Sequence, residues 1–253
     1  MENENAVAGP GNWVRRLVKV NKNAAAKPGT WVRRLAKVVA LVSVALVALY
    51  VVASMAWRFS GSNQWELARD QGGVKVYTLK APGSDLTQAK GVVQVRSTLG
   101  GLVKLMTDPS TCDGAGCHAV SNTRVDEWLE YASFTIDLPF PFQKREFVIR
   151  SQIHQDPSTK EILVVVGPAP DKAPPNDCCF RVTNMNNTWR FTPLENGLVE
   201  MEFVYSIDVG GFVPNLLMNT MRPKRVADAL LAAKDILYKK KYQDVKLDYI
   251  KEK

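Results

Sequence analysis

Four cysteines and two histidines are the side chains of this 253-residue chain best suited to covalent or metal chemistry. Cys112 and Cys117 enclose a short Gly-containing loop and precede His118, so a local disulfide, a pair of free thiols and a metal site are all open interpretations. The spacing lacks the paired knuckles typical of zinc sites, which makes a disulfide between Cys112 and Cys117 the main candidate. We do not expect the adjacent Cys178 and Cys179 to bond to each other, because a bridge between neighbouring residues is strained.

Known catalytic signatures are absent from the sequence. It has no nucleophile elbow, no Gly-rich phosphate loop and no HExxH motif. His154 falls on the polar parity of its strand, and a solvated strand face explains the acidic cluster of Asp126, Glu127 and Glu130. We therefore predict a protein without catalytic residues, without a metal and without a cofactor.

The elements that would position a binding site are mostly strands. From about residue 63 onward, short runs of alternating apolar and polar residues are separated by turn residues, which is typical of antiparallel strands. In the clearest run, Met201, Phe203 and Tyr205 share one face while Glu200 and Glu202 share the other. The predicted strands cover residues 74–79, 89–97, 124–136, 145–155, 161–167, 179–192 and 199–208.

Two helices are expected beside these strands. A short one covers about residues 101–107 and ends before Asp108-Pro109. The long one comes last, at about 213–242, because apolar residues recur there at helical spacing. Pro223 falls inside it and is expected to kink or restart the helix. The apolar stripe of this helix must be buried, and the curved apolar face of the sheet is the available surface.

The excess positive charge of the chain lies at its N-terminus. The formal net charge of the chain is +8. Residues 1–60 hold nine Lys and Arg and two acidic residues, which gives +7, so residues 61–253 carry a net charge of +1. A near-neutral domain has no electrostatic footprint for binding phosphate backbones. We therefore predict no nucleic-acid partner.

An uncharged run at residues 38–57 is long enough to cross a bilayer. Its twenty residues span roughly 30 Å as a helix. Basic residues precede the run, so the positive-inside rule predicts a cytoplasmic segment 1–37, a transmembrane helix or signal anchor at 38–57 and an extracytoplasmic remainder, periplasmic if the protein is bacterial. A signal peptide cleaved near Ser54-Met55-Ala56 is one alternative, and a buried core helix is another. The membrane is thus a predicted partner.

Three motifs in order across residues 63–240 resemble those of START (StAR-related lipid transfer) domains, and the resemblance is closest to single-domain bacterial members. The motifs are Trp65–Leu67 with Gly73–Tyr77, then Pro139–Val148, then Thr188–Pro193 with Tyr205–Pro214. The resemblance implies an α+β helix-grip fold at residues 63–245, in which a curved antiparallel sheet wraps around the long C-terminal helix. It also implies a hydrophobic tunnel that holds a lipid or a sterol-like molecule.

Ligand contacts are predicted on the inward parity of the strands and the last helix. These candidates are Trp128, Tyr131, Phe134, Arg145, Phe147, Ile149, Trp189, Phe203, Tyr205, Met218, Met221 and Leu230. Each could equally be a packed core residue.

The resemblance also bears on charge in the tunnel and on the kind of function. Sterol-carrying members can place a buried acid and Arg in the tunnel, whereas Ala132 and Ser151 fall near those positions here. Arg145 or Arg150 could supply such a charge instead. The implied function is non-enzymatic binding and transfer of a lipid. One alternative is a cyclase or hydrolase acting on an apolar substrate, because related helix-grip folds include such enzymes. The other is a regulatory or scaffolding domain that binds another protein, which a filled tunnel would favour.

Overall fold

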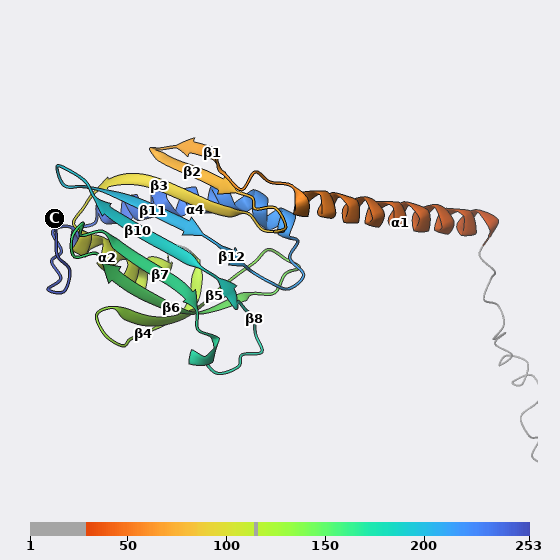
Figure 1. The fold of residues 1–253 in the computed structure, drawn as a ribbon. Coiled ribbons are helices and arrows are strands. Elements are labelled where there is room, and N and C mark those ends of the chain that lie inside the picture. Colours follow the sequence, from red (N-terminus) through yellow and green to blue (C-terminus); the bar gives the residue numbers. More distant parts are fainter. Residues whose placement is uncertain (1–28, 114–115) are drawn as a thin grey trace, which may run out of the picture. The chain divides into compact units, whose positions relative to one another are not determined.

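The computed structural model describes residues 29–113 and 116–253 (Figure 1). The chain divides into two units, one ending at Ala53 and the other running from Ser54 to Lys253. Most of the predicted basic segment, residues 1–28, lies outside the described residues.

Helix α1 (Thr30–Phe59) contains the apolar run that the sequence predicts at residues 38–57. By length and composition it is long and apolar enough to cross a membrane, and none of the side chains in this described helix is buried. Its last residues belong to the second unit. There Trp57 Nε1 donates to the Asp85 carbonyl at 3.1 Å, and Arg58 pairs with the Asp85 carboxylate at 3.5 Å.

One sheet organises the second unit (Figure 1). Its strands follow the order β1-β2-β3-β11-β10-β7-β6-β5-β4, with β8 beside β6, while β12 and β9 pair separately. Neighbours along the path are antiparallel, and β8 runs parallel to β6. The strands are β1 (Trp65–Gln71), β2 (Val74–Leu79), β3 (Gln88–Arg96), β4 (Cys117–Arg124), β5 (Leu129–Ile136), β6 (Arg145–Gln155), β7 (Ile162–Pro168), β8 (Phe180–Arg181), β9 (Asn184–Met185), β10 (Asn187–Pro193), β11 (Leu198–Tyr205) and β12 (Ile207–Asp208).

Two of the predicted strands are divided in the structure. The single strand predicted at 124–136 is wrong, because the Asp126 carboxylate accepts a hydrogen bond from the Trp128 amide at 2.7 Å and turns the chain between β4 and β5. The strand predicted at 179–192 is broken into β8, β9 and β10, because Asn184 and Met185 leave the main sheet to pair with β12.

The helices of the second unit are α2 (Leu99–Thr107), α3 (Ser110–Asp113) and α4 (Asn215–Leu237), with 3-10 turns η2 (Pro170–Lys172) and η3 (Lys240–Tyr242). Helix α4 continues through Pro223, so the predicted restart there is wrong. The preceding turn is held from outside. Asn219 Oδ1 accepts from the Thr87 amide at 3.0 Å, and Arg222 Nη1 donates to the Thr87 carbonyl at 2.6 Å. These anchors offset the backbone hydrogen bond that Pro223 cannot make.

The main core lies between α4 and one half of the sheet. Helix α4 packs on β1, β2, β3 and β11. Gly91 of β3 permits this close approach, because a Cβ atom there would lie 2.4 Å from Leu230 Cδ1 and 2.6 Å from Val226 Cγ1. A second apolar cluster gathers residues of β6, β12 and the start of α4, including Phe147, Ile207 and Met218.

The C-terminal tail packs beyond the predicted domain end at residue 245. The Glu252 carboxylate accepts hydrogen bonds from the amides of Leu99 and Gly100 at 2.8 and 2.9 Å. An anionic group at this position caps the N-terminus of α2 and interacts favourably with the helix dipole.

Candidate functional site

The candidate site is the side of the sheet on which α4 packs, which we call the inner face. Cross-strand pairing of Phe134 with Phe147 and of Trp189 with Phe203 places these four aromatic residues on this face. Alternate residues of β11 are buried, as expected for a strand with one face toward the core. The structure therefore brings together several of the residues that the sequence proposes as ligand contacts.

Part of the inner face is incompletely covered. Helix α4 packs on β1, β2, β3 and β11. Phe134, Ile149, Trp189 and Tyr205 are only half-buried, and we call them the half-buried group. Two of these aromatic rings are stacked, Trp189 on Phe203 with centroids 4.0 Å apart and Phe134 on Phe147 at 5.1 Å. Fixed, partly accessible aromatic rings can contact an apolar molecule with little loss of side-chain entropy.

Other predicted contacts lie in the packed core. Phe147, Phe203, Met218 and Leu230 are buried, and Leu230 closes over Gly91. Met221 lies at the edge of the helix stripe and is exposed. The four buried side chains support the inner face more than they expose surface to a ligand.

Trp128 and Tyr131 lie apart from the half-buried group. Trp128 packs edge-on against Tyr249 with ring centroids 5.4 Å apart. Tyr131 pairs with Arg150 and lies on the opposite face of β5 from Phe134, where Lys172 Nζ is 5.2 Å from its ring centroid. The structure therefore does not bring Tyr131 to the inner face.

Arg145 holds the connection between β12 and α4. Its Nε donates to the Val209 carbonyl at 2.6 Å, its Nη2 to the Gly210 carbonyl at 2.9 Å and its Nη1 to the Gln143 carbonyl at 2.6 Å. The side chain is buried, and burial lowers the pKa of its guanidinium. All three nitrogens thus serve the backbone, while Arg150 is exposed on the other face of β6.

Two arginines of α4 place positive charge beside the inner face, whereas the sequence suggests Arg145 or Arg150 of β6 for this charge. Arg222 is 1% exposed, and its guanidinium lies 5.6 Å from the Tyr205 ring centroid. Arg225 follows one turn later and is half-buried, although charged side chains on helices are usually exposed. The signal that could have revealed it is spacing, because Met218, Arg222 and Arg225 fall on one stripe of a helix.

Glu130 is a buried carboxylate on β5. Its Oε1 accepts from Asn122 Nδ2 at 2.7 Å, whereas Asp126 and Glu127 of the same cluster are exposed. Burial raises the pKa of Glu130, and the charge of Arg124 lowers it by less.

We predict that Glu130→Gln stabilises the protein at neutral pH. The folded state holds the Glu130 proton more tightly than the unfolded chain, so stability falls as pH rises from about 4 through the raised pKa. Gln keeps an oxygen for Asn122 without the buried charge. The melting temperature at pH 7 should rise by about 2–4 °C, the effect of roughly 1 kcal/mol in a domain of this size, and the gain should vanish near pH 4. Exposed Glu127→Gln is the control; an unchanged or lower melting temperature for Glu130→Gln at pH 7 would contradict the prediction.

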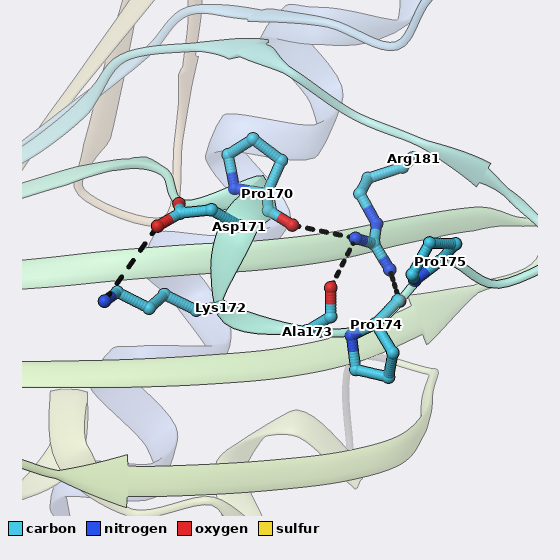
Figure 2. A pocket seen from close by; sticks show the side chains of 7 residues that line it. All are labelled: Pro170, Asp171, Lys172, Ala173, Pro174, Pro175 and Arg181. Atoms are coloured by element: carbon cyan, nitrogen blue, oxygen red, sulfur yellow. Dashed lines mark hydrogen bonds and ion pairs between the residues drawn. The ribbon is translucent and has the colours of Figure 1, made fainter.

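Of three cavities in the second unit, one borders the half-buried group, at Phe134. One of about 550 Å³ is lined by residues 170–175 and Arg181, whose guanidinium bonds to the carbonyls of Pro170, Ala173 and Pro174 (Figure 2). One of about 150 Å³ lies by Ser84 and Ile207. A third, of about 420 Å³, borders Phe134 and the 173–177 loop. Arg181 thus ties the proline-rich loop in Figure 2 through Nη1 and Nη2, while its Nε donates to the Glu146 carboxylate at 2.7 Å.

The cysteines form two local bridges. Cys112 and Cys117 are bonded with Cα atoms 5.3 Å apart, which removes their thiolates as metal ligands. Cys178 and Cys179 are also bonded, so the prediction that they would not pair is wrong. A turn at this point, in which Asn176 Oδ1 accepts from the Cys178 amide at 2.9 Å, brings the adjacent side chains together.

Comparison with known proteins gives a fold but no matching family model. An uncharacterized protein of Pseudomonas aeruginosa is 23% identical over 180 residues, which are 69% of this chain and 89% of that protein. Identity at this level leaves the function open.

Several solved structures are similar to this chain. A STAR-related lipid transfer protein from Xanthomonas axonopodis has a TM-score of 0.64 and 22% identity, covering 69% of this chain and 99% of its own. Human STARD10 has a TM-score of 0.61 and 13% identity, covering 74% and 78%, and human StAR-related lipid transfer protein 5 has 0.58 and 15%, covering 76% and 94%. The chain therefore has the START fold, and the α+β helix-grip fold predicted from its motifs is confirmed.

Proposed function

We propose that the second unit binds a lipid or another hydrophobic molecule, without transforming it, in a tunnel between the inner face of the sheet and α4. The half-buried group of Phe134, Ile149, Trp189 and Tyr205 carries this proposal. An apolar ligand that buries about 300 Å² against such residues gains about 7 kcal/mol before association costs. Burial of apolar area therefore supplies much of the driving force for binding, with no chemical step.

The proposal also gives α1 the role of a membrane anchor. Arg33, Arg34 and Lys37 lie on the N-terminal side of its apolar run, which favours a cytoplasmic N-terminus and an extracytoplasmic second unit. The two disulfides support this orientation, because such bonds persist in oxidising compartments.

We predict that a C-terminal alkaline phosphatase fusion in a bacterial host is active and that a C-terminal green fluorescent protein fusion is dark. The first reporter folds only outside the cytoplasm, and the second fluoresces only inside it. Replacing Arg33, Arg34 and Lys37 by Glu should weaken the bias, because it removes the positive charges nearest the span. The opposite pattern of reporter activity in the unmodified chain would contradict the proposed topology.

Exchange of the ligand with the membrane is proposed to use two loops at residues 137–144 and 209–214. Arg145 joins them through the carbonyls of Gln143 and Val209. Phe140 and Phe212, one in each loop, are 97% and 102% exposed. Exposed aromatic rings on adjoining loops are suited to contact a bilayer interface.

An enzyme that acts on an apolar substrate in the same place is the second candidate. It is favoured by Glu130, because a buried carboxyl group with a raised pKa is suited to general acid–base chemistry. Under this alternative Glu130→Gln would abolish conversion of the ligand. Under the binding proposal, ligand recovered from the wild-type protein and from Glu130→Gln is chemically identical.

Native mass spectrometry of the full chain in a neutral detergent, followed by solvent extraction, tests the proposed function. We expect one hydrophobic molecule per chain that resists detergent washing. A chain that is empty and also fails to take up fluorescent fatty acids, phospholipids and sterols would overturn the proposal.

A further inference from the structure

Helix α4 carries two guanidinium groups whose Nε atoms are buried without a hydrogen-bond partner among the described residues. Arg222 uses its other nitrogens, donating from Nη1 to the Thr87 carbonyl and from Nη2 to the Ile207 carbonyl, both at 2.6 Å. Arg225 makes no such anchoring contact within the described part of the chain. A buried donor without a partner is costly, so Arg225 is the side chain in this region that a bound group could satisfy.

The contacts of α4 show which way Arg225 faces. Leu231 and Lys234 lie against the turn between β1 and β2, where a Cβ atom on Gly72 or Gly73 would meet them at 3.0 and 3.8 Å. Val226 and Leu230 cover Gly91 of β3. At 3.6 residues per turn, Arg225 falls on the other flank of this buried stripe, beside Met218 and toward β11.

Tyr205 of β11 supports this position. Burial raises the pKa of its hydroxyl, while the charges of Arg222 and Arg225 both lower it, so both guanidiniums lie near this ring. Tyr205 is in turn packed edge-on to Phe203, with ring centroids 6.1 Å apart, and Phe203 stacks on Trp189. Arg225 therefore lies where the half-buried group meets α4.

Charge compensation is missing at this point. Helix α4 forms an ion pair between Lys224 and Asp228 on its exposed side, but neither Arg222 nor Arg225 has a carboxylate at ion-pair distance among the described residues. The acid that influences Arg222 is Asp208, which raises its pKa against the larger lowering effect of burial. Two cations beside an apolar surface, with no acid in contact, are stabilised when an anion binds between them and water.

We propose that the hydrophobic ligand carries an anionic oxygen headgroup, a carboxylate or a phosphate, and that Arg225 binds this headgroup beside Tyr205. The apolar chain of the ligand then lies along Phe203 and Trp189. This assignment rests on the proposed function, because it names the ligand class of the same site. The specificity of the site then lies on α4. There the Nε atom of Arg225 has no partner among the described residues, and Arg222 supplies a second charge that is held by two backbone carbonyls.

The test compares an acid with its neutral ester in matched variants of the full chain. Binding of cis-parinaric acid and of its methyl ester is measured by fluorescence in nanodiscs of zwitterionic lipid, for the wild type, Arg225→Gln, Arg225→Lys and Lys224→Gln. Lys224→Gln removes one positive charge from the exposed side of the same helix. Thermal unfolding of each variant shows that it is folded.

We expect the wild type and Lys224→Gln to bind the acid about tenfold or more tightly than the ester, as a charge-assisted hydrogen bond would give. Arg225→Gln should lose this preference and keep its ester affinity, and Arg225→Lys should retain part of the preference. Dodecyl phosphate should displace the acid, while dodecanol and inorganic phosphate should not. Displacement by inorganic phosphate alone would overturn the proposal in favour of a site for free anions.

Two further outcomes separate this inference from the proposed function. If acid and ester bind equally and Arg225→Gln changes neither, the headgroup assignment fails while the proposed function stands. If a folded wild-type chain binds neither probe, nor dodecyl phosphate, nor dodecanol, both fail.

Discussion

Replacing Ala132 with Trp should abolish ligand uptake while leaving the protein folded. Ala132 is half-buried on the inner face of β5, directly opposite Ile149 of β6 and two residues from Phe134. A Trp side chain there would occupy the space that we assign to the ligand, which would lose most of its buried apolar area. We expect affinity for a fluorescent lipid to fall by about 100-fold or more, measured by titration of the full chain in nanodiscs.

The stability of the same variant reports whether open space exists at Ala132. In a filled core the added volume would cost about 1–3 kcal/mol; in an open tunnel it should cost little. Arg150→Trp is the matched control, because Arg150 is exposed on the other face of the paired strand. Unchanged uptake by a folded Ala132→Trp variant would show that the ligand does not lie on this part of the inner face.

Arg145→Met should destabilise the protein strongly. The substitution keeps an apolar stem but leaves the carbonyls of Gln143, Val209 and Gly210 without the donors they now have. Leaving a carbonyl acceptor without its donor costs about 1–3 kcal/mol per group, and for these three carbonyls we expect the melting temperature to fall by about 10 °C in a domain of this size. Thermal unfolding followed by circular dichroism measures the change.

The same variant decides between two roles for Arg145. The sequence offers it as a ligand contact, whereas its hydrogen bonds give it the task of fixing the connection between β12 and α4. Arg150→Met, an exposed substitution five residues along β6, should change stability by less than about 0.5 kcal/mol. If Arg145→Met melts like the wild type but no longer binds ligand, the contact role is right and the structural role is wrong.

Much of the fold follows from local pattern. Strands β2 and β6 begin and end where alternation predicts them, and the apolar stripe of the last helix identifies α4. Strand β4 was missed because Cys117–Arg124 is an edge strand with mostly polar, exposed residues, so no buried face marks it in the sequence. The uninterrupted path of α4 through Pro223 depends on Asn219 and Arg222 contacting Thr87, a residue far away along the chain.

The site was harder to predict than the fold. Alternation along a strand predicts the face on which a residue lies, but it does not predict which other residues cover it. Parity correctly groups Phe203 with Tyr205, yet it cannot show that Phe203 is buried while Tyr205 is half-buried. Arg225 looks like a solvated residue in the sequence, since charged side chains on helices are usually exposed. Its position beside Tyr205 arises from the packing of α4 on β3 and β11.

Photo-crosslinking can locate the hydrophobic ligand that we place between the inner face and α4. The full chain in nanodiscs is irradiated with a fatty acid that carries a diazirine in its chain, and the modified peptides are identified by mass spectrometry. We expect adducts at Ile149, Trp189 and Tyr205 that are lost in Ala132→Trp and retained in Arg150→Trp. Adducts confined to α1 or to the exposed Phe140 and Phe212, unchanged by Ala132→Trp, would contradict this placement.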